Sequence, residues 1–207
     1  MGGDLRVSRA DDAGGDLRVL VVDEWPERAE LLREALLRAG YEVTASLSSP
    51  VALLKTIDQL KPDVIVIDTD SPSRDVLEHL VVMSQHTPRP VVMFATDGAP
   101  ETIREAVRAG VSAYVVDGLE KNRIKAIIDV AVARFEDFQR LREELAEANL
   151  KLAERKLVDR AKGLLMKSRK LDEEAAYALL RKFAMDRKLR IGEVAQQLID
   201  AADLLGT

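Results

Sequence analysis

Acidic side chains and one hydroxyl stand where apolar stretches of strand length end, a pattern suited to metal and phosphoryl chemistry. Five residues occupy such positions: Asp23, Glu24, Asp68, Thr96 and Asp117. Because ligand sites of open α/β sheets form outside the carboxyl ends of the strands, we expect these side chains to converge. Such acids favour a hard cation such as Mg²⁺. With its charge screened, a carboxylate there could attack a phosphoryl donor, and Thr96 could bond the new phosphoryl oxygen.

The segments that must position these residues alternate between strand and helix patterns. Strands are expected at 17–22, 42–46, 63–67, 90–95 and 113–116, and helices at 26–39, 51–60, 76–84 and 101–109. Gly40 and Gly110 follow two of the helices as stop signals. This alternation predicts an α/β fold with a doubly wound, five-stranded parallel sheet. The preceding residues 1–16 are rich in Gly and Asp and predict a flexible tail.

A long helix is expected next, because neither Gly nor Pro occurs from Lys121 until Gly163. Its apolar residues repeat at spacings of three and four, at Phe138, Leu141, Leu145, Ala148 and Leu152. Such a seam favours a coiled coil, and therefore a homodimer through 138–152. The alternative is an amphipathic helix that packs on its own domain.

Three short amphipathic helices in the C-terminal third are expected to form a small bundle. Asp172 is placed to cap the second helix. The expected apolar stripes are Leu157, Ala161, Leu164 and Ser168, then Ala176, Leu179, Leu180 and Phe183, then Ile191, Val194, Ala195, Leu198 and Ile199.

Basic charge is concentrated in this bundle. The whole chain carries a net charge of −5, yet residues 155–190 hold 12 basic and 5 acidic side chains. At 100° per residue, Lys156, Arg160, Gly163 and Lys167 share one helix face, and Tyr177 and Arg181 share a face of the next helix. Bases beside an aromatic ring suit RNA loops, where cations hold phosphates and a ring stacks on a base. A solvated basic helix face would give the same pattern.

Composition excludes several classes of protein. The chain has no cysteine and only two histidines, which excludes disulfides, thiolate zinc sites, cysteine nucleophiles and multi-histidine metal sites. The bundle contains no catalytic set of residues, so no enzyme activity is expected. Neither a membrane-spanning run nor a signal peptide is apparent, so no membrane partner is expected and a cytoplasmic protein is predicted.

Four segments resemble the receiver domain of two-component response regulators over about 17–130: 21–24, 67–68, 95–96 and 113–116. The resemblance implies Asp23, Glu24 and Asp68 as Mg²⁺ ligands and Asp68 as phosphoacceptor. It also implies Thr96 and Tyr114 as the switch hydroxyl and switch aromatic.

Asp117 departs from the receiver pattern. Receivers usually place there a lysine that pairs with the phosphoryl group, whereas an acid adds repulsion. Asp117 is therefore the third predicted switch residue, after Thr96 and Tyr114. The departure leaves phosphoryl signalling open and favours a pseudo-receiver that a partner protein switches.

The C-terminal third closely resembles the ANTAR domain of the AmiR/NasT transcription antiterminators over about 154–205. The matching segments are 161–166, 174–177, 180–181, 184–185 and 193–195. The motif positions imply Lys162, Gly163, Tyr177 and Arg181 as RNA contacts, whereas Lys156, Arg160 and Lys167 rest on the helical-face argument. Residues 68–75 and 113–119 resemble the NasT branch, whose pattern also fits Asp117.

The resemblance implies a dimeric antiterminator that binds paired hairpins in leader RNA, in control of nitrate and nitrite assimilation. A nitrate-sensing inhibitory protein or a histidine kinase would be its partner. The expected domains are the tail 1–16, the receiver-like domain 17–130, a helical linker 131–155 and the ANTAR-like bundle 154–207. A DNA-binding response regulator is the alternative, because 184–199 faintly resembles a helix-turn-helix. Against it, the exposed side of that helix offers acids and glutamines rather than bases.

Overall fold

A computed structural model describes residues 17–49, 52–116 and 123–205. The chain divides into two compact units, residues 1–138 and 139–207. The expected tail 1–16 and Asp117 lie outside the described residues. Because the two units are separate bodies, each is considered by itself.

The first unit is a five-stranded parallel sheet in the order β2-β1-β3-β4-β5. Its strands are β1 (Arg18–Asp23), β2 (Glu42–Leu47), β3 (Val64–Thr69), β4 (Val91–Ala95) and β5 (Ala113–Val116). Its helices are α1 (Pro26–Arg38), α2 (Leu53–Leu60), α3 (Arg74–His86), α4 (Pro100–Arg108) and the start of α5 (Ile124–Arg169). This confirms the α/β doubly wound fold expected from the alternation of patterns.

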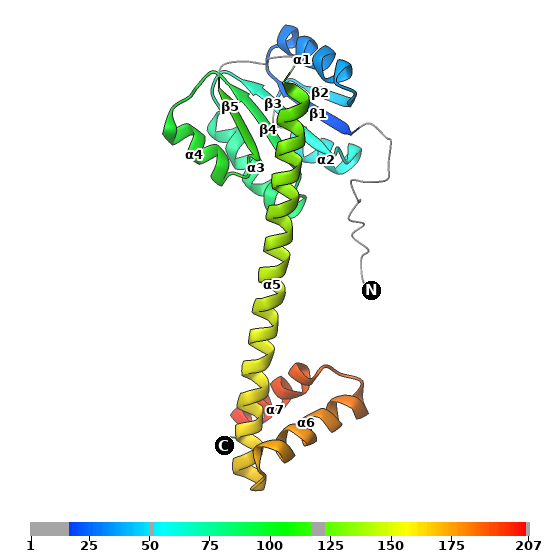
Figure 1. Cartoon of the computed structure of the whole chain (residues 1–207). Coiled ribbons are helices and arrows are strands. Elements are labelled where there is room, and N and C mark those ends of the chain that lie inside the picture. Colours follow the sequence, from blue (N-terminus) through cyan, green and yellow to red (C-terminus); the bar gives the residue numbers. More distant parts are fainter. Residues whose placement is uncertain (1–16, 50–51, 117–122, 206–207) are drawn as a thin grey trace. The chain divides into compact units, whose positions relative to one another are not determined.

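Helices cover both faces of the sheet, so its central strands are buried on both sides (Figure 1). One core joins the sheet to α2, α3 and α4, with Ile57 and Leu80 among its buried members. The other core joins the sheet to α1 and the first turns of α5, through Leu36, Ile124 and Ile128. The near-continuous Val and Ile content of β3 and β4 follows from this burial on both faces.

Several element ends differ from the sequence expectation for a local physical reason. Helix α3 begins at Arg74, two residues early, because the Ser73 hydroxyl accepts the Val76 N–H and caps the helix. Strand β1 includes Asp23, because the ladder with β3 continues to the pair formed by Asp23 and Asp68. Helices α1 and α4 are each followed by a glycine in the left-handed region, as expected, and α1 begins at Pro26 as expected, whereas α4 begins one residue early, at Pro100.

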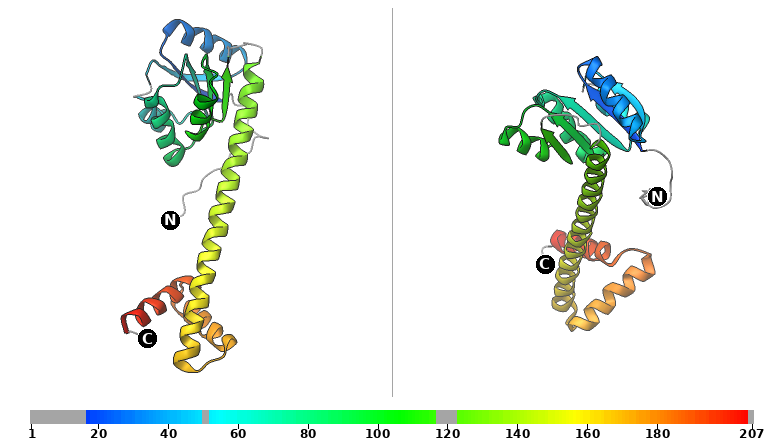
Figure 2. Two further views of the ribbon diagram at one scale, coloured as in Figure 1. Left: turned by 90° about the vertical axis from the view of Figure 1, so that its left-hand side faces the viewer. Right: turned by 45° about the horizontal axis from the view of Figure 1, so that its top comes forward.

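The second unit packs α6 (Glu173–Arg187) and α7 (Ile191–Leu205) against the last turns of α5, and Figure 2 shows these three helices from two further sides. Asp172 caps α6 by accepting the Ala175 N–H at 2.7 Å, as predicted. The stripe on α6 needs one correction. Ala184 is buried, whereas Phe183 is 40% exposed beneath the Arg187 guanidinium. The stripe on α5 also needs a correction, because Ser168 is exposed, whereas Val158 and Leu165 are buried beside Ala161.

Close approach of α7 to α5 is fixed at Gly192. Its N–H donates to Glu154 Oε1 at 3.3 Å, and a Cβ added at Gly192 would lie 2.8 Å from Glu154 Cγ. The Glu154 carboxylate therefore satisfies an N–H at the start of α7 that has no partner within the helix.

Between the two cores, α5 is exposed on every side. All residues from 140 to 153 are exposed, and Leu141, Leu145 and Leu152 of the predicted seam are each more than half exposed. Leucines on a fully solvated helix leave apolar surface without cover.

Candidate functional sites

The acids at the end of the sheet surround a guanidinium. Asp23 on β1 and Asp68 on β3 are neighbours in register, so their carboxylates emerge side by side. Arg28, in the first turns of α1, reaches back over them. Its Nη2 donates to Asp23 Oδ1 at 3.3 Å, its Nη1 donates to Asp70 Oδ1 at 2.6 Å, and its Nε lies 3.9 Å from Asp68 Oδ2. We call Arg28 with Asp23, Asp68 and Asp70 the acid pocket.

Burial and charge act on these groups in opposite directions. Burial raises the pKa of Asp68, the positive charge of Arg28 opposes this, and the charges of Asp23 and Asp70 add to it, so the net direction is upward. Burial lowers the pKa of Arg28, but its bonds to Asp70 and Asp23 and the charge of Asp68 outweigh burial. Arg28 therefore stays charged and is the counter-charge that keeps Asp68 closer to its ordinary state.

The acid pocket fits a divalent cation in part. Asp23 is fully buried, and its Oδ2 has no hydrogen-bond partner among the described residues, so it could ligate a hard cation. Glu24, however, is exposed, and no three acids or histidines in the described residues are grouped as a metal site. Asp23 and Asp68 are thus the residues that would hold Mg²⁺ in this place. The cation would screen their charges.

The switch residues are joined through a loop that the sequence did not single out. Thr96 is exposed, and its N–H donates to the Asp70 carbonyl at 3.1 Å. The Tyr114 hydroxyl donates to the Asp97 carbonyl at 2.7 Å, and its ring packs against the core. The Asp97 carboxylate accepts bonds from Ser71 and Thr102. Asp97 therefore connects the loop after β3 with α4, and Tyr114 bonds to the same residue.

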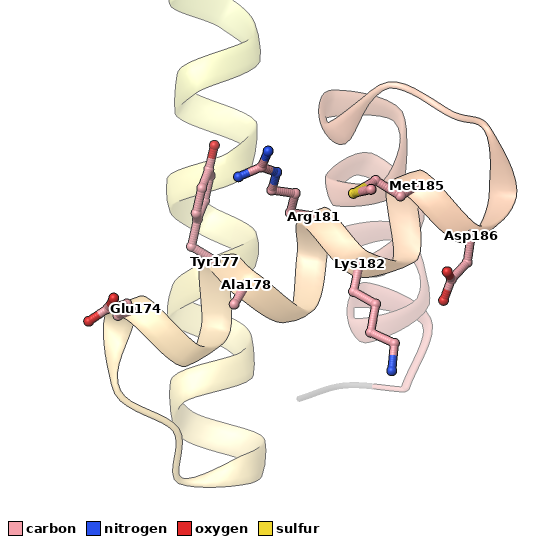
Figure 3. Close-up of a pocket in the computed structure, with 7 residues that line it drawn as sticks. All are labelled: Glu174, Tyr177, Ala178, Arg181, Lys182, Met185 and Asp186. Atoms are coloured by element: carbon pink, nitrogen blue, oxygen red, sulfur yellow. The ribbon is translucent and has the colours of Figure 1, made fainter.

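On the bundle, Tyr177 stands at the border of two hollows. The first, of about 390 Å³, lies along α6 and is lined by Glu174, Tyr177, Ala178, Arg181, Lys182, Met185 and Asp186. Figure 3 shows the Tyr177 ring and the Arg181 guanidinium projecting on the same side of α6, with Lys182 on another side. The Tyr177 side chain is 46% exposed, so its ring is open to a stacking partner.

The second hollow, of about 380 Å³, lies between α5 and α6. Its basic lining residues are Lys151, Arg155 and Lys162, and Tyr177 is shared with the first hollow. Lys162 Nζ lies 2.8 Å from Asp159 and 2.7 Å from Glu173, and these carboxylates, Asp159 first, hold its pKa above the ordinary value. Lys162 is therefore charged but already partnered within the bundle.

The remaining RNA candidates form a separate stripe on α5. Lys156, Arg160, Gly163 and Lys167 share one face, about a third of a turn from Lys162. Arg160 is bound by Asp203 of α7 at 2.8 Å, whereas no acid within the described residues pairs with Lys156 or Lys167. A Cβ added at Gly163 would meet nothing within 4 Å, so this face is open. The structure thus joins Lys162, Tyr177 and Arg181, but it does not join them to the stripe.

Four basic residues in these sites were missed by the sequence analysis. Arg28 was not predicted, because its role depends on a long side chain that reaches back from α1 to the strand ends. Lys182 was not predicted either, although it follows Arg181 directly and lines the same hollow. Lys151 and Arg155 could have been found, since at 100° per residue they lie on the same face of α5 as Lys162.

Comparison with known families identifies both units. Residues 19–129 match the response regulator receiver domain, and residues 146–199 match the ANTAR domain. The chain belongs to the response regulator receiver family and carries an ANTAR domain. These are modules of a regulatory, non-enzymatic protein. The ANTAR match begins within α5, upstream of the residue at which the sequence motifs begin.

Among individual proteins, the chain is similar to the transcriptional regulatory protein PdtaR of Mycobacterium tuberculosis. The two are 29% identical over 200 residues, which is 95% of this chain and 94% of that protein. It is also 23% identical to the chemotaxis protein CheY of Listeria monocytogenes, over 56% of this chain and 98% of that one.

Solved structures support the fold of the first unit. A pilus assembly-related protein from Burkholderia pseudomallei superposes with a TM-score of 0.54, at 25% identity, over 59% of this chain and 94% of that chain. A two-component response regulator of the LuxR family from Aurantimonas gives a TM-score of 0.52 at 22% identity, over 57% and 86% of the chains. No helix within the described residues is long and apolar enough to cross a membrane.

Proposed function

We propose that this response regulator is a transcription antiterminator that binds paired hairpins in leader RNA. The observation that carries the proposal is the ANTAR match over a bundle whose exposed Tyr177 stands between two sets of basic side chains. The similarity to PdtaR, a transcriptional regulatory protein, along almost the whole chain supports a role in transcription. We expect it to act in the cytoplasm, where leader transcripts are made.

The two hollows suggest how one unpaired base and its flanking phosphates would bind. The Tyr177 ring stacks on the base, because stacking needs a flat, solvent-exposed aromatic face. Arg181 contacts a phosphate from the first hollow, and Arg155 contacts one from the second. Arg155 is 82% exposed, and its nearest acid, Asp159, is 4.0 Å away. Lys162 orients the start of α6 through Glu173 and adds positive charge beneath the ring.

The stripe on α5 would bind a second stretch of RNA backbone. Lys156 and Lys167 offer charges with no partner among the described residues, and Gly163 lets a backbone approach closely between them. Contacts of this kind add affinity without reading sequence. Arg160 would contribute less, because Asp203 already holds its guanidinium.

We expect Tyr177→Ala to weaken binding of a two-hairpin leader RNA by about 1–3 kcal/mol. Tyr177→Phe should bind as the natural protein does, because the stacking ring is kept. The loss should vanish when the loop base is deleted from the RNA. Filter binding or fluorescence anisotropy at fixed salt measures these affinities.

Basic side chains give a second readout in the same assay. Lys167→Ala should weaken all RNAs alike and lower the slope of log affinity against log salt by roughly one unit. Arg181→Ala should weaken binding and leave the loop-sequence preference intact, because Arg181 holds a phosphate, and a relaxed preference would show instead that this side chain reads a base. Unchanged hairpin affinity in a folded variant carrying both Lys162→Ala and Arg181→Ala would refute this site.

A DNA-binding response regulator is the competing proposal, with α7 as its reading helix. The polar side chains of α7 are largely acids and amides, and two of them are bonded to each other, Gln196 Nε2 to Asp200 Oδ1 at 2.6 Å. A reading helix needs donors and cations facing base edges and phosphates. Tighter binding to random duplex DNA than to paired hairpins at the same salt would favour this alternative.

Dimer formation would let one regulator hold two hairpins. We propose that the seam at Phe138, Leu141, Leu145, Ala148 and Leu152 joins two chains as a coiled coil. The leucines of this seam are exposed on a helix segment that is solvated all round. Packing them against a second copy would bury them at the spacing that a two-stranded coil requires.

The receiver is proposed to be a pseudo-receiver that a partner protein switches. The pocket already holds Arg28 against Asp23 and Asp70, and the Asp117 departure argues against a stable aspartyl phosphate. We expect acetyl phosphate with Mg²⁺ to leave Asp68 largely unmodified, as intact-protein mass spectrometry would record. Stoichiometric, long-lived phosphate on Asp68 would instead support a histidine kinase as the partner.

The finer assignment to nitrate and nitrite assimilation rests on the resemblance of 68–75 and 113–119 to the NasT branch. It implies a nitrate-sensing inhibitory protein as the partner. Transcript levels of nitrate-reductase genes in a deletion strain, with and without nitrate, test this assignment separately from RNA binding.

A further inference from the structure

We propose that Arg28 is the resident cation of the acid pocket, and that a divalent cation binds Asp23 and Asp68 only when the Arg28 side chain moves aside. The guanidinium contacts the same two carboxylates that would ligate the metal. Arg28 stands at the sixth residue after Val22, early in α1, where its side chain can reach the ends of both β1 and β3. The pocket therefore holds a cation supplied by its own fold.

Arg28 makes its shortest contact with the most exposed of the three carboxylates and longer contacts with the two that lie deeper. The shortest, 2.6 Å, is to Asp70, whose side chain is 67% exposed, and the contact to buried Asp23 is 3.3 Å. The separation from Asp68 is 3.9 Å, too long for a hydrogen bond, and Nε has no partner among the described residues. The guanidinium is thus held firmly at the rim and loosely inside. It can swing outward while it keeps its bond to Asp70.

The negative charge of the acid pocket favours replacement of the Arg28 guanidinium by a divalent cation. Among the described residues, three carboxylates surround one guanidinium and leave the pocket net negative, and the buried Asp23 Oδ2 has no hydrogen-bond partner there. A divalent cation would neutralise more of this charge, but it binds oxygen at about 2.0–2.1 Å and would share the pocket with a positive neighbour. The resident guanidinium therefore opposes the metal by repulsion and by occupying the space.

The chain contains its own reporter for this exchange. Trp25 is its only tryptophan, and the backbone N–H of Trp25 donates to Asp23 Oδ1 at 2.8 Å. A metal bound at Asp23 would compete for this hydrogen bond and shift the backbone that carries the Trp25 side chain, so Mg²⁺ binding is read from tryptophan emission. Full-length protein is titrated with MgCl₂ at constant ionic strength. We expect Arg28→Met to lower the Mg²⁺ dissociation constant at least tenfold.

Matched variants distinguish a local effect of the Arg28 guanidinium on Mg²⁺ binding from the effect of removing any positive charge from α1. Arg33→Met removes another arginine of α1. Arg33 pairs with Glu30 at 2.6 Å and does not contact the acids of the pocket. This substitution should leave the Mg²⁺ affinity unchanged, and Arg28→Lys should keep it weak. Asp23→Asn added to Arg28→Met should abolish the gain, which places the metal at Asp23.

The Mg²⁺ titration contains no RNA, so its result does not depend on whether the proposed RNA-binding function is correct. If Arg28→Met fails to fold by circular dichroism, Arg28→Gln keeps a polar side chain without the charge, and Mn²⁺ binding by electron paramagnetic resonance replaces emission. An affinity in the Arg28 variants no tighter than that of the natural protein would overturn the proposal. Equal tightening in Arg33→Met would overturn it as well.

Discussion

We expect a variant carrying Leu141→Asp and Leu145→Asp to sediment as a monomer at concentrations where the natural chain is a dimer. Both leucines lie on the predicted seam of α5, and their side chains are 59% and 61% exposed in the single chain. Burying a leucine side chain contributes about 1.5–3 kcal/mol, and each dimer would lose four of them. The substitutions also place like charges opposite each other. A rise in the dimer dissociation constant of about a thousandfold or more follows, equivalent to ~4 kcal/mol.

Leu150→Asp is the matched control. It makes the same chemical change on the same helix, at a side chain that is 71% exposed and about half a turn from Leu141. Analytical ultracentrifugation should show this variant as a dimer. If natural chain, double variant and control share one sedimentation coefficient, the seam is not the interface.

We also expect a large loss of stability when Leu180, in the core of the bundle, is replaced by alanine. Leu180 of α6 is 2% exposed and packs with Ala161, Ala176 and Ala195, so Leu180→Ala opens a cavity in a small core. Such truncations cost about 2–5 kcal/mol in the free energy of unfolding. A bundle of this size has little stability in reserve, and we expect it to unfold at a much lower urea concentration.

The same experiment tests whether the two cores are independent. Trp25 reports on the receiver unit alone, whereas far-ultraviolet circular dichroism follows helix loss in both units. Leu180→Ala should move the dichroism transition of the bundle and leave the Trp25 transition in place. Leu204→Ala, at a side chain that is 87% exposed on α7, makes the same type of truncation and should change neither. A shift of the Trp25 transition by Leu180→Ala would contradict independent cores.

Periodicity predicted the receiver fold well, because burial on both faces leaves unmistakable runs such as 64–67 and 91–95. It also placed Asp23 and Asp68 at the same edge, and the structure pairs them in register. What periodicity does not contain is the reach of a long side chain. Arg28 is unremarkable on α1, yet it defines the acid pocket because β1 and β3 end within its span.

The bundle shows the same limit. The stripe of α7 was predicted well, and that of α6 except at Phe183, which is exposed while Ala184 is buried. The stripe of α5 was predicted about one residue out of place, because Val158 and Leu165 are buried and Ser168 is exposed. The RNA candidates were predicted as two sets, one from motif positions and one from a helix face. The structure places Lys162, Tyr177 and Arg181 of the first set around two hollows that share Tyr177, which helix periodicity does not predict.

The boundary between the two units falls inside α5, at residues 138 and 139, and this decides how the chain can be cut into working pieces. The first turns of α5 complete the receiver core through Ile124, Ile128 and Ala131, and its last turns supply Val158, Ala161 and Leu165 to the bundle. A fragment of either unit must therefore carry its own share of the helix. Within α5, the solvated stretch 140–153 offers a place to divide the gene without removing core side chains. A protease would find no loop there, so the two units are expected to resist release by limited digestion.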